Sequence, residues 1–424
     1  VMARTARIVV LTLVSLAACA GSEELAPVDL ERDAGGNDVH DLDAGTSDTT
    51  RPDLDARAPD AGEPTAPPLA CEVEPCFERV AGNGANAICA LTTQGAVWCW
   101  GSDGELDVWN PKPQGALGRG VPVTDPVLAA TPMPVPGLDS VVELTVGHGD
   151  ASCALRNDGS VWCWGTQPEQ GFSSAPSRVE GLPPAAHVVA DSRMGCAVVR
   201  DDRSPWCWGP SWSSLLPEGS DGGATRVWKG TRPVRQIGLG VGRFSGTHDA
   251  LLLLTEDRSI VSWGTAPGRP SSLAEGRDLS PATIDVVTYG RWVGAYRFIA
   301  DDRAYAWSTS TGDRVANVIP QLDGTRLLEL GERIAVDADG RVFVWGSNAW
   351  GELGSLPEEL LRAEAPVTVA LPAKARSVAS AKGGAFCASL VDGSIVCWGR
   401  NLEGQLGRRV RDGELHPRPE RIKP

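Results

Sequence analysis

The sequence predicts an all-β fold, a seven-bladed β-propeller, and two observations carry that prediction. The first observation is the block Cys153–Gly165, in which two apolar β-prone stretches flank Asn157-Asp158-Gly159, a strong hairpin-turn signal. The second is that this block recurs along the chain, and each copy ends at a tryptophan: Trp100, Trp164, Trp208, Trp263, Trp307, Trp345 and Trp398. Repeats of roughly 50 residues are typical of solenoids and propellers.

Each repeat supplies enough β-prone pieces for one small sheet. Two short pieces precede the hairpin, as Met133–Leu138 and Val141–Val146 precede the second one, so we expect four-stranded antiparallel blades. The first repeat lacks a leading strand, whereas the chain ends with a surplus piece, Pro417–Lys423. We therefore expect this C-terminal piece to complete the first blade, so that N- and C-terminal strands close the ring and protect its edges.

Residues 1–18 have the pattern of a lipoprotein signal peptide. Arg4 and Arg7 precede Ile8–Leu16, an apolar run too short to span a bilayer. The string that ends at Cys19, Leu-Ala-Ala-Cys, resembles the lipobox of bacterial lipoproteins, which implies that Cys19 is acylated. Ala20 is not the aspartate that retains many Gram-negative lipoproteins at the inner membrane, so we expect an outer-membrane or cell-surface location. An ordinary signal peptide cleaved nearby is the alternative.

Residues 19–70 are expected to form a disordered acidic linker before the propeller of residues 71–424. Residues 20–70 contain 13 acidic and 3 basic side chains and no aromatic residue, too little apolar surface to offset the entropy of ordering. Since this linker contributes −10 and the segment before it +2 to the net charge of −15, the propeller carries −7. It therefore lacks the basic footprint of a nucleic-acid-binding protein.

A second motif follows the Trp-Gly pairs. Gly-x-Leu-Gly occurs at Gly115–Gly118, Gly351–Gly354 and Gly404–Gly407. Together the two motifs resemble the regulator of chromosome condensation repeat over residues 77–424, and its cysteine-bearing form resembles secreted bacterial members of the family. The resemblance implies a seven-bladed propeller closed by both termini. It is weaker in repeats three to five, where Gly-x-Leu-Gly is missing and Trp307 is followed by Ser308.

Ten cysteines remain besides Cys19, an even number that indicates disulfides in an exported chain. Eight face one another across hairpins, where Cα atoms are close enough for a disulfide, and two more start the folded body. The expected pairs are Cys89 with Cys99, Cys153 with Cys163, Cys196 with Cys207, Cys387 with Cys397, and Cys71 with Cys76. Metal binding is the alternative. No Cys-x-x-Cys occurs, so we expect no metal site.

No pattern in the sequence indicates an active site, and we expect no catalytic residue and no cofactor. There is no nucleophile elbow and no phosphate-binding glycine loop. The five histidines are scattered: His40, His148, His187, His248 and His416. The turn at Asp158 is similar to the Asp-box of sialidase propellers, so a secreted glycan hydrolase stays as an alternative. However, Tyr289, Tyr296 and Tyr305 all lie in one repeat without an arginine pattern.

A binding face is the function that the sequence favours. Trp109, Trp212 and Trp350 each follow a Trp-Gly pair by a few residues, so all three should emerge on one rim of the propeller. Loop aromatics on a rigid scaffold are typical of binding hot spots, although each could instead cover its own loop. We expect a membrane-anchored monomer that binds an unknown protein or glycan at the cell surface. Inhibition of an extracellular enzyme and a passive coat role are the alternatives.

Overall fold

The computed structural model describes the following residues: 64–104, 115–147, 149–167, 171–191, 194–209, 216–217, 220–228, 232–240, 250–257, 260–264, 295–300, 303–308, 317–331 and 333–424. The chain divides into two units, Val1–Ala58 and Pro59–Pro424, and every described residue lies in the second. None of the helices in the described part of the chain is long and apolar enough to span a membrane.

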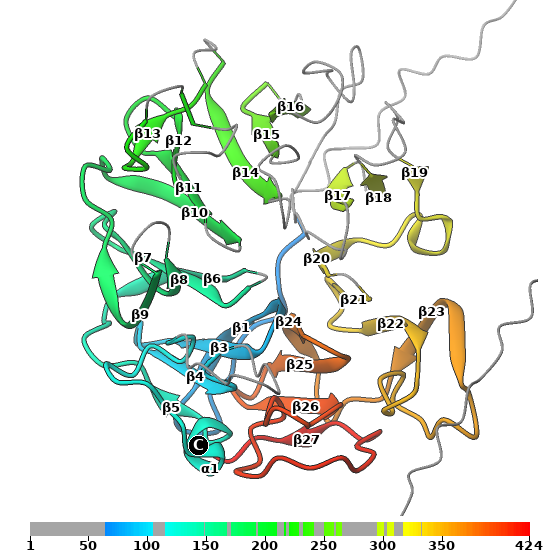
Figure 1. Ribbon diagram of the computed structural model, residues 1–424. Coiled ribbons are helices and arrows are strands. Elements are labelled where there is room, and N and C mark those ends of the chain that lie inside the picture. The colour runs from blue at the N-terminus through cyan, green and yellow to red at the C-terminus, as the bar shows by residue number, and fades with distance from the viewer. Residues whose placement is uncertain are drawn as a thin grey trace, which may run out of the picture. The chain divides into compact units, whose positions relative to one another are not determined.

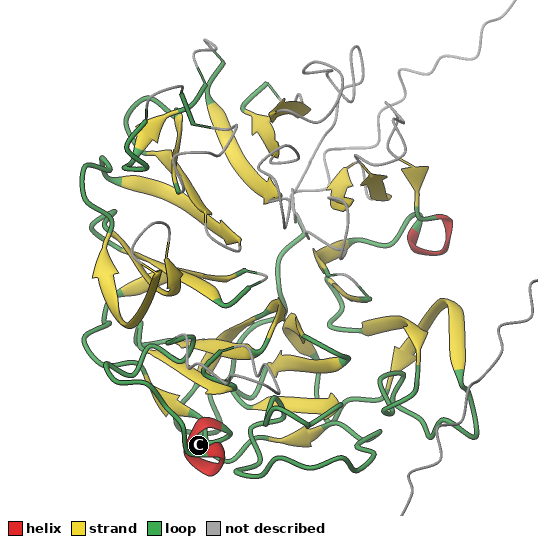
Figure 2. Ribbon diagram, viewed as in Figure 1, coloured by secondary structure: helices red, strands yellow, loops and turns green. Residues whose placement is uncertain are grey.

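The described residues form strands and turns almost throughout, with one short helix, α1 (Pro126–Ala129), and one 3-10 turn, η1 (Pro320–Leu322) (Figures 1 and 2). They build seven sheets, numbered here in chain order. The first three sheets are β1 (Phe77–Ala81), β3 (Ala87–Thr92), β4 (Val97–Gly101) and β5 (Met133–Pro134); β6 (Val141–Val146), β7 (Ala151–Arg156), β8 (Val161–Gln167) and β9 (Gly171–Arg178); and β10 (Ala185–Asp191), β11 (Met194–Val199), β12 (Pro205–Trp208) and β13 (Thr225–Arg226). The fourth and fifth are β14 (Val234–Gly240), β15 (Ala250–Thr255) and β16 (Ile260–Gly264); and β17 (Ala295–Ala300), β18 (Arg303–Ser308) and β19 (Asn317–Val318). The sixth and seventh are β20 (Leu327–Leu330), β21 (Ile334–Asp337), β22 (Val342–Ser347) and β23 (Arg362–Val369); and β2 (Asn83–Ala85), β24 (Ala375–Ala381), β25 (Ala385–Leu390), β26 (Ile395–Gly399) and β27 (Glu420–Arg421).

The hairpin at the centre of each sheet follows from its turn residues. In the second sheet Asp158 Oδ1 accepts hydrogen bonds from the Ser160 amide (2.8 Å) and hydroxyl (2.7 Å), and the Trp162 indole donates to the same hydroxyl. Gly159 has a φ of +89°, which a side chain would oppose. The resulting register sets Cys153 opposite Cys163, as predicted from the sequence.

All five disulfides expected from the sequence are formed. The bonded pairs are Cys71 with Cys76, Cys89 with Cys99, Cys153 with Cys163, Cys196 with Cys207, and Cys387 with Cys397. In the four hairpin pairs the Cα atoms lie 4.0–4.1 Å apart, and in the N-terminal pair they lie 5.3 Å apart. In the chain-entropy model, each disulfide that closes a loop as short as these hairpins stabilises the folded state by about 2–3 kcal/mol.

The strand order corrects one expectation. The piece upstream of the second hairpin, β5, pairs with β4 of the first sheet, so the outer strand of each complete sheet comes from the chain after its Trp-Gly. The C-terminal β27 likewise pairs with β26 in the seventh sheet. The expectation that Pro417–Lys423 completes the first blade is therefore wrong. The physical reason is that the tryptophan-bearing strand has a free edge, and the chain leaving it folds back antiparallel onto that edge.

The tryptophans that end the hairpins join neighbouring sheets. Trp100, Trp164 and Trp398 are fully buried, and each indole N–H donates to a carbonyl in the Gly-x-Leu-Gly loop of the preceding sheet. Trp164 bonds to Ala116 (3.1 Å) and Trp398 to Glu352 (2.9 Å). The last glycine of the motif provides the space, because a Cβ on Gly118 would lie 2.8 Å from the Trp164 ring.

The same bond joins the seventh sheet to the first, because the Trp100 indole donates to Gln405 O at 2.8 Å. In addition β2 pairs with β24 in parallel, and the Val80 amide donates to Ser377 Oγ at 2.8 Å. Contacts join the first sheet to the second and onward to the fourth, and the fifth through the seventh back to the first (Figure 1). Residues 265–294, between β16 and β17, lie outside the described residues, so the closed seven-bladed ring stays a prediction for that junction.

Asp392 connects its own turn in the seventh sheet to the C-terminal strand β27 and to the segment before the first sheet. Its carboxylate accepts from the Ser394 amide (2.9 Å) and hydroxyl (2.6 Å) and pairs with Arg421 of β27. Its backbone carbonyl accepts from the Glu72 amide at 2.8 Å. Burial alone would raise the pKa of Asp392, but the Ser394 hydrogen bonds and the Arg421 charge lower it overall.

We predict that Asp392→Asn lowers the free energy of unfolding at pH 7 by about 1–3 kcal/mol, because the charge-assisted bonds to Arg421 and Ser394 weaken. A carboxylate whose pKa is lowered by folding contributes stability above the unfolded pKa, near 3.8, and loses it as the pH falls through the folded pKa. Denaturant unfolding at pH 7, 4 and 3 should therefore show the gap between wild type and variant closing in acid. Asp201→Asn, at an exposed turn, is the control, and a gap as large at pH 3 as at pH 7 would contradict the prediction.

Candidate binding site

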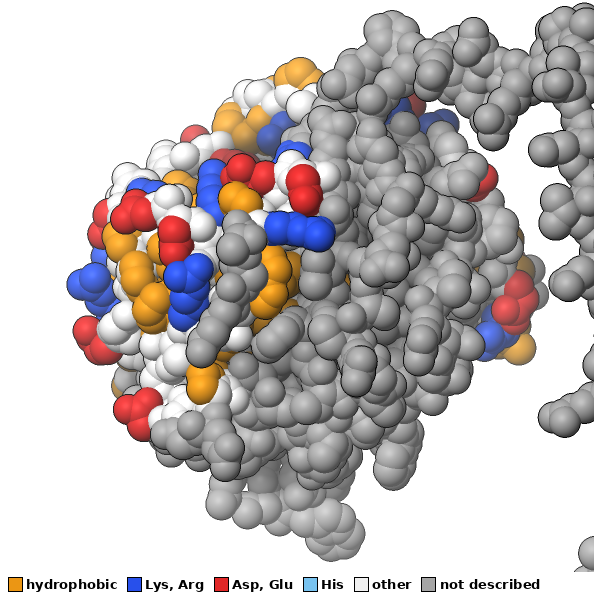
Figure 3. Space-filling view, turned by 90° about the horizontal axis from the view of Figure 1, so that it is seen from above, with side chains coloured by type: hydrophobic (Ala, Val, Ile, Leu, Met, Phe, Trp, Pro, Cys, Tyr) orange, Lys and Arg blue, Asp and Glu red, His pale blue; other side chains and the backbone are white. Residues whose placement is uncertain are grey.

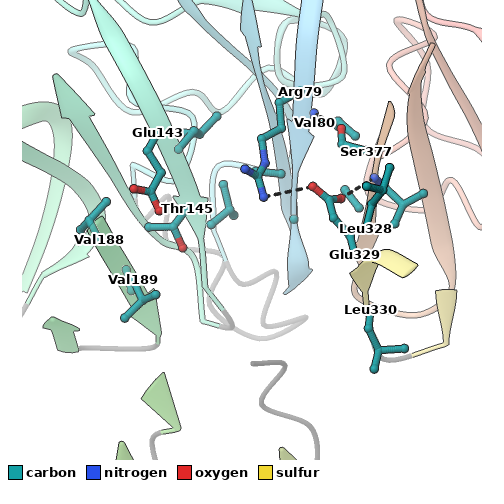
Figure 4. Close-up of a pocket in the computed structure, with 18 of the residues that line it drawn as sticks. Arg79, Val80, Glu143, Thr145, Val188, Val189, Leu328, Glu329, Leu330 and Ser377 are labelled. Carbon is teal, nitrogen blue, oxygen red and sulfur yellow. Dashed lines mark hydrogen bonds and ion pairs between the residues drawn. The ribbon is translucent and has the colours of Figure 1, made fainter. Parts of the chain in front are cut away.

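The innermost strands of six sheets enclose one cavity of about 620 Å³. Residues from β1, β6, β10, β14, β20 and β24 line it, so positions from Glu78 to Ser380 in the sequence meet in one place. Figure 4 shows the valines of β10 and the leucines of β20 on opposite walls, with charged side chains between them. Val142 of β6 also lines the cavity and is 55 % exposed, which leaves apolar surface open inside the cavity.

One ion pair in the cavity connects three sheets. Arg79 Nη2 of β1 lies 3.0 Å from Glu329 Oε1 of β20 (Figure 4). The other oxygen of Glu329 accepts from the Val378 amide of β24 at 2.8 Å. Because the carboxylate of Glu329 is largely buried, removing its partners would leave a buried charge unpaired, which costs more than the loss of a surface ion pair.

A second pair connects the second and third sheets. His187 Nδ1 of β10 lies 2.5 Å from Glu143 Oε1 of β6. Burial alone would lower the pKa of His187, but the charge of Glu143 and its hydrogen bond raise it overall. The imidazole therefore carries a proton at neutral pH more readily than a free histidine does. Nothing in the sequence indicated this pair, because its members lie in different repeats and outside any motif.

The second part of the candidate binding site consists of the loops that leave the tryptophan-bearing strands. We call the described parts of three of them, residues 102–104 with 115–132, 348–361 and 400–419, the rim loops. Each has a buried Asp or Asn at the third position after its Trp: Asp103, Asn348 and Asn401. The side-chain oxygen of each accepts from the leucine amide of the Gly-x-Leu-Gly motif, at distances from 2.7 to 3.2 Å.

The remaining atoms of these three side chains fix the rest of each loop. Asp103 Oδ2 accepts from the Val123 amide (2.7 Å), whereas the amide nitrogens of Asn348 and Asn401 donate to the carbonyls of Leu360 (2.7 Å) and Val410 (3.0 Å). Burial raises the pKa of Asp103, although the backbone hydrogen bonds and the charge of Arg119 oppose the shift. Two of the loops thus use an uncharged amide where the first uses a carboxyl group.

Trp350 is the one predicted face tryptophan among the described residues, and it is partly exposed in the second rim loop. Its amide donates to Glu352 Oε2 at 2.7 Å, and Arg400 of the third rim loop lies over its ring, with Cζ 5.8 Å from the centroid. Burial raises the pKa of Glu352 despite the Trp350 amide and nearby Arg333. Trp109 and Trp212 lie outside the described residues, so the shared rim of the three tryptophans stays a prediction.

The other predicted residues are placed as follows. Cys19 and the acidic linker up to residue 63 lie outside the described residues, as do His40, His148, His248 and Tyr289. His416 lies in the third rim loop, where Nε2 is 2.6 Å from Asp412 Oδ1 and Nδ1 is 2.7 Å from Arg408 Nη1. Tyr296 and Tyr305 lie on β17 and β18. Within the described residues no group of three His, Cys, Asp or Glu side chains is placed to hold a metal ion.

Charges on the visible surface are mixed. On the side of the molecule in Figure 3, acidic and basic side chains of described residues alternate with hydrophobic ones. Many of the exposed large apolar side chains belong to the rim loops, among them Val127 and Leu128 on α1, Leu361, and Val410. The rim loops therefore offer apolar contacts bordered by charges of both signs.

Comparison with known proteins agrees with these motifs. Residues 339–390, which include β22, β23, β24 and β25, match the regulator of chromosome condensation (RCC1) repeat. A curated relative, the mitochondrial RCC1 domain-containing protein RUG3 of Arabidopsis thaliana, is 26 % identical over 194 residues; these are 38 % of this chain and 42 % of RUG3, so the match spans less than half of that relative.

Solved structures with the same kind of similarity include Prp20p of Saccharomyces cerevisiae, with a TM-score of 0.42 and 19 % identity over 81 % of this chain and 76 % of that one. Human WBSCR16 gives a TM-score of 0.40 and 17 % identity over 83 % of each chain. The repeat match, together with the Trp-Gly and Gly-x-Leu-Gly motifs, shows that this chain carries the RCC1 repeat, as the sequence predicted.

Proposed function

We propose that this protein is an exported, lipid-anchored and non-catalytic binding module of the cell envelope, and that its rim loops contact a protein or glycan partner. The observation that carries the proposal is the construction of those loops. In each loop a buried Asp or Asn accepts a hydrogen bond from the Gly-x-Leu-Gly motif of the same loop, so the described parts of the loops are ordered before any partner binds. Preorganised loops on a rigid scaffold lose little entropy on binding.

The disulfides support the exported location. Five disulfides indicate an oxidising compartment, which agrees with the signal peptide and lipobox pattern ending at Cys19. The chemistry of the cavity supports a non-catalytic role, because Arg79, Glu329, Glu143 and His187 are paired with one another across sheets. Such pairs stabilise the junctions between sheets.

Trp350 lies in the second rim loop, and Trp109 and Trp212 are predicted to emerge on the same rim. The proposal predicts that Trp109→Ala, Trp212→Ala and Trp350→Ala together remove most binding, since aromatic anchors each contribute about 2 kcal/mol or more at an interface. Partners captured from a native envelope extract by wild-type protein should be lost by the triple variant. The matched control is Glu180→Ala with Asp201→Ala, two exposed positions outside the rim loops. Capture of the same partners in equal amounts by the triple variant would refute the assignment of this face.

The lipid anchor predicts that Cys19→Ala moves the protein from the membrane fraction to the soluble envelope fraction, because the acylated thiol is its only proposed attachment. Fractionation with immunoblotting measures this, and globomycin treatment of wild-type cells provides an independent readout of lipoprotein processing. An unchanged membrane fraction for Cys19→Ala, together with no accumulation of uncleaved precursor under globomycin, would contradict the anchor and leave the rim-loop proposal standing.

A further inference from the structure

The segment Pro64–Ala70, here called the strap, lies at the cavity described above. Ala66 is one of the residues that line the cavity, and Pro67 is buried. Arg376, at the start of β24, donates from Nη1 to the Pro67 carbonyl. The propeller therefore already holds a piece of its own chain against the wall of its central cavity.

The course of the strap is fixed by backbone hydrogen bonds outside the cavity. The Ala70 amide donates to Val391 O at 2.6 Å, and the Glu72 amide donates to Asp392 O at 2.8 Å. Val391 and Asp392 belong to the turn between β25 and β26. The disulfide of Cys71 with Cys76 follows directly, so the strap runs from a fixed point on this turn into the cavity.

The composition of the strap suits this position. Three of its seven residues are prolines, at positions 64, 67 and 68. Proline restricts the chain to an extended conformation, which lowers the entropy lost on docking, and it leaves carbonyl groups as the main hydrogen-bonding atoms. A guanidinium is a matching donor, because it offers five N–H groups and no acceptor.

Arg376 retains a donor beyond the one that holds the strap. Its Nε is buried and has no hydrogen-bond partner among the described residues, although buried donors are nearly always satisfied. Arg376 itself lines the cavity of about 620 Å³. The guanidinium group that binds the Pro67 carbonyl therefore belongs to a residue of the cavity wall, where the carbonyls of another bound segment could take the place of Pro67.

We propose that the central cavity is a binding site for an extended, proline-containing peptide, that Arg376 recognises its backbone carbonyls, and that the strap is a built-in competitor for this site. The strap is held next to its site by a short piece of chain, so its effective concentration is high and free peptide competes poorly in the wild type. Release of the strap exposes the site. This inference does not depend on the rim loops.

The test uses the full chain and a fluorescein-labelled peptide of residues 60–70 as the probe, measured by fluorescence anisotropy. Ala70→Pro removes the amide that bonds to Val391 and so loosens the strap, whereas Ala70→Ser keeps that amide. We expect Ala70→Pro to lower the Kd of the peptide at least tenfold relative to wild type, and Ala70→Ser to leave it unchanged. Arg376→Ala added to Ala70→Pro should weaken binding at least tenfold, and a scrambled peptide should not compete.

Equal affinity of the peptide for wild type and Ala70→Pro, or binding that survives Arg376→Ala, would overturn the proposal. If Ala70→Pro does not fold, Arg376→Ala alone in the full chain takes its place. Hydrogen exchange of residues 64–70, read by mass spectrometry, should then rise clearly in Arg376→Ala and not in Arg418→Ala, an exposed arginine near the C-terminus. Exchange that is equal in the two variants would also overturn the proposal.

Discussion

The hydrogen bond from a closing tryptophan to the Gly-x-Leu-Gly loop of the preceding sheet is the interaction on which the rest of this structure depends. A single repeat of this kind cannot bury the apolar faces of its sheet alone. Trp164 and Trp398 fill the gaps between sheets, and a buried indole N–H needs an acceptor. Since the acceptor belongs to the preceding repeat, the bond also sets how consecutive sheets pack, and Trp100 extends this rule from the last repeat to the first.

What the sequence predicts well here is local. Asp158 and Gly159 define a turn, the turn defines a register, and the register sets cysteines opposite each other, so the hairpins and their disulfides could be derived without the fold. Which sheet each outer strand joins could not be derived in this way, because it depends on pairing across a long connection, as between β4 and β5. Because β5 is close to the second hairpin in the sequence, we expected the two to pair. In the structure β5 pairs instead with the free edge of the first hairpin.

The candidate sites also differ in whether local sequence could predict them. The rim position of Trp350 follows from its distance after Trp-Gly, and its contact with Arg400 follows from the packing of adjacent repeats. The cavity pairs had no signal in the sequence, since Arg79 and Glu329 belong to the first and sixth sheets and meet only because six inner strands converge. The strap was equally hidden, because a proline-rich stretch at the end of an acidic linker is predicted to be disordered until Arg376 is placed beside it. One scaffold thus separates an outer loop surface from an inner polar cavity.

The most direct test of this account is the free energy of unfolding of two matched variants, Trp100→Phe and Trp164→Phe, with Trp162→Phe as the control, since the Trp162 indole bonds within its own turn. The account predicts that the first two variants lose similar stability, about 1–3 kcal/mol each, and that the control loses clearly less. A Trp100→Phe variant as stable as the wild type, beside a destabilised Trp164→Phe, would contradict it, because the last repeat would then not be held to the first as the other repeats are held to one another.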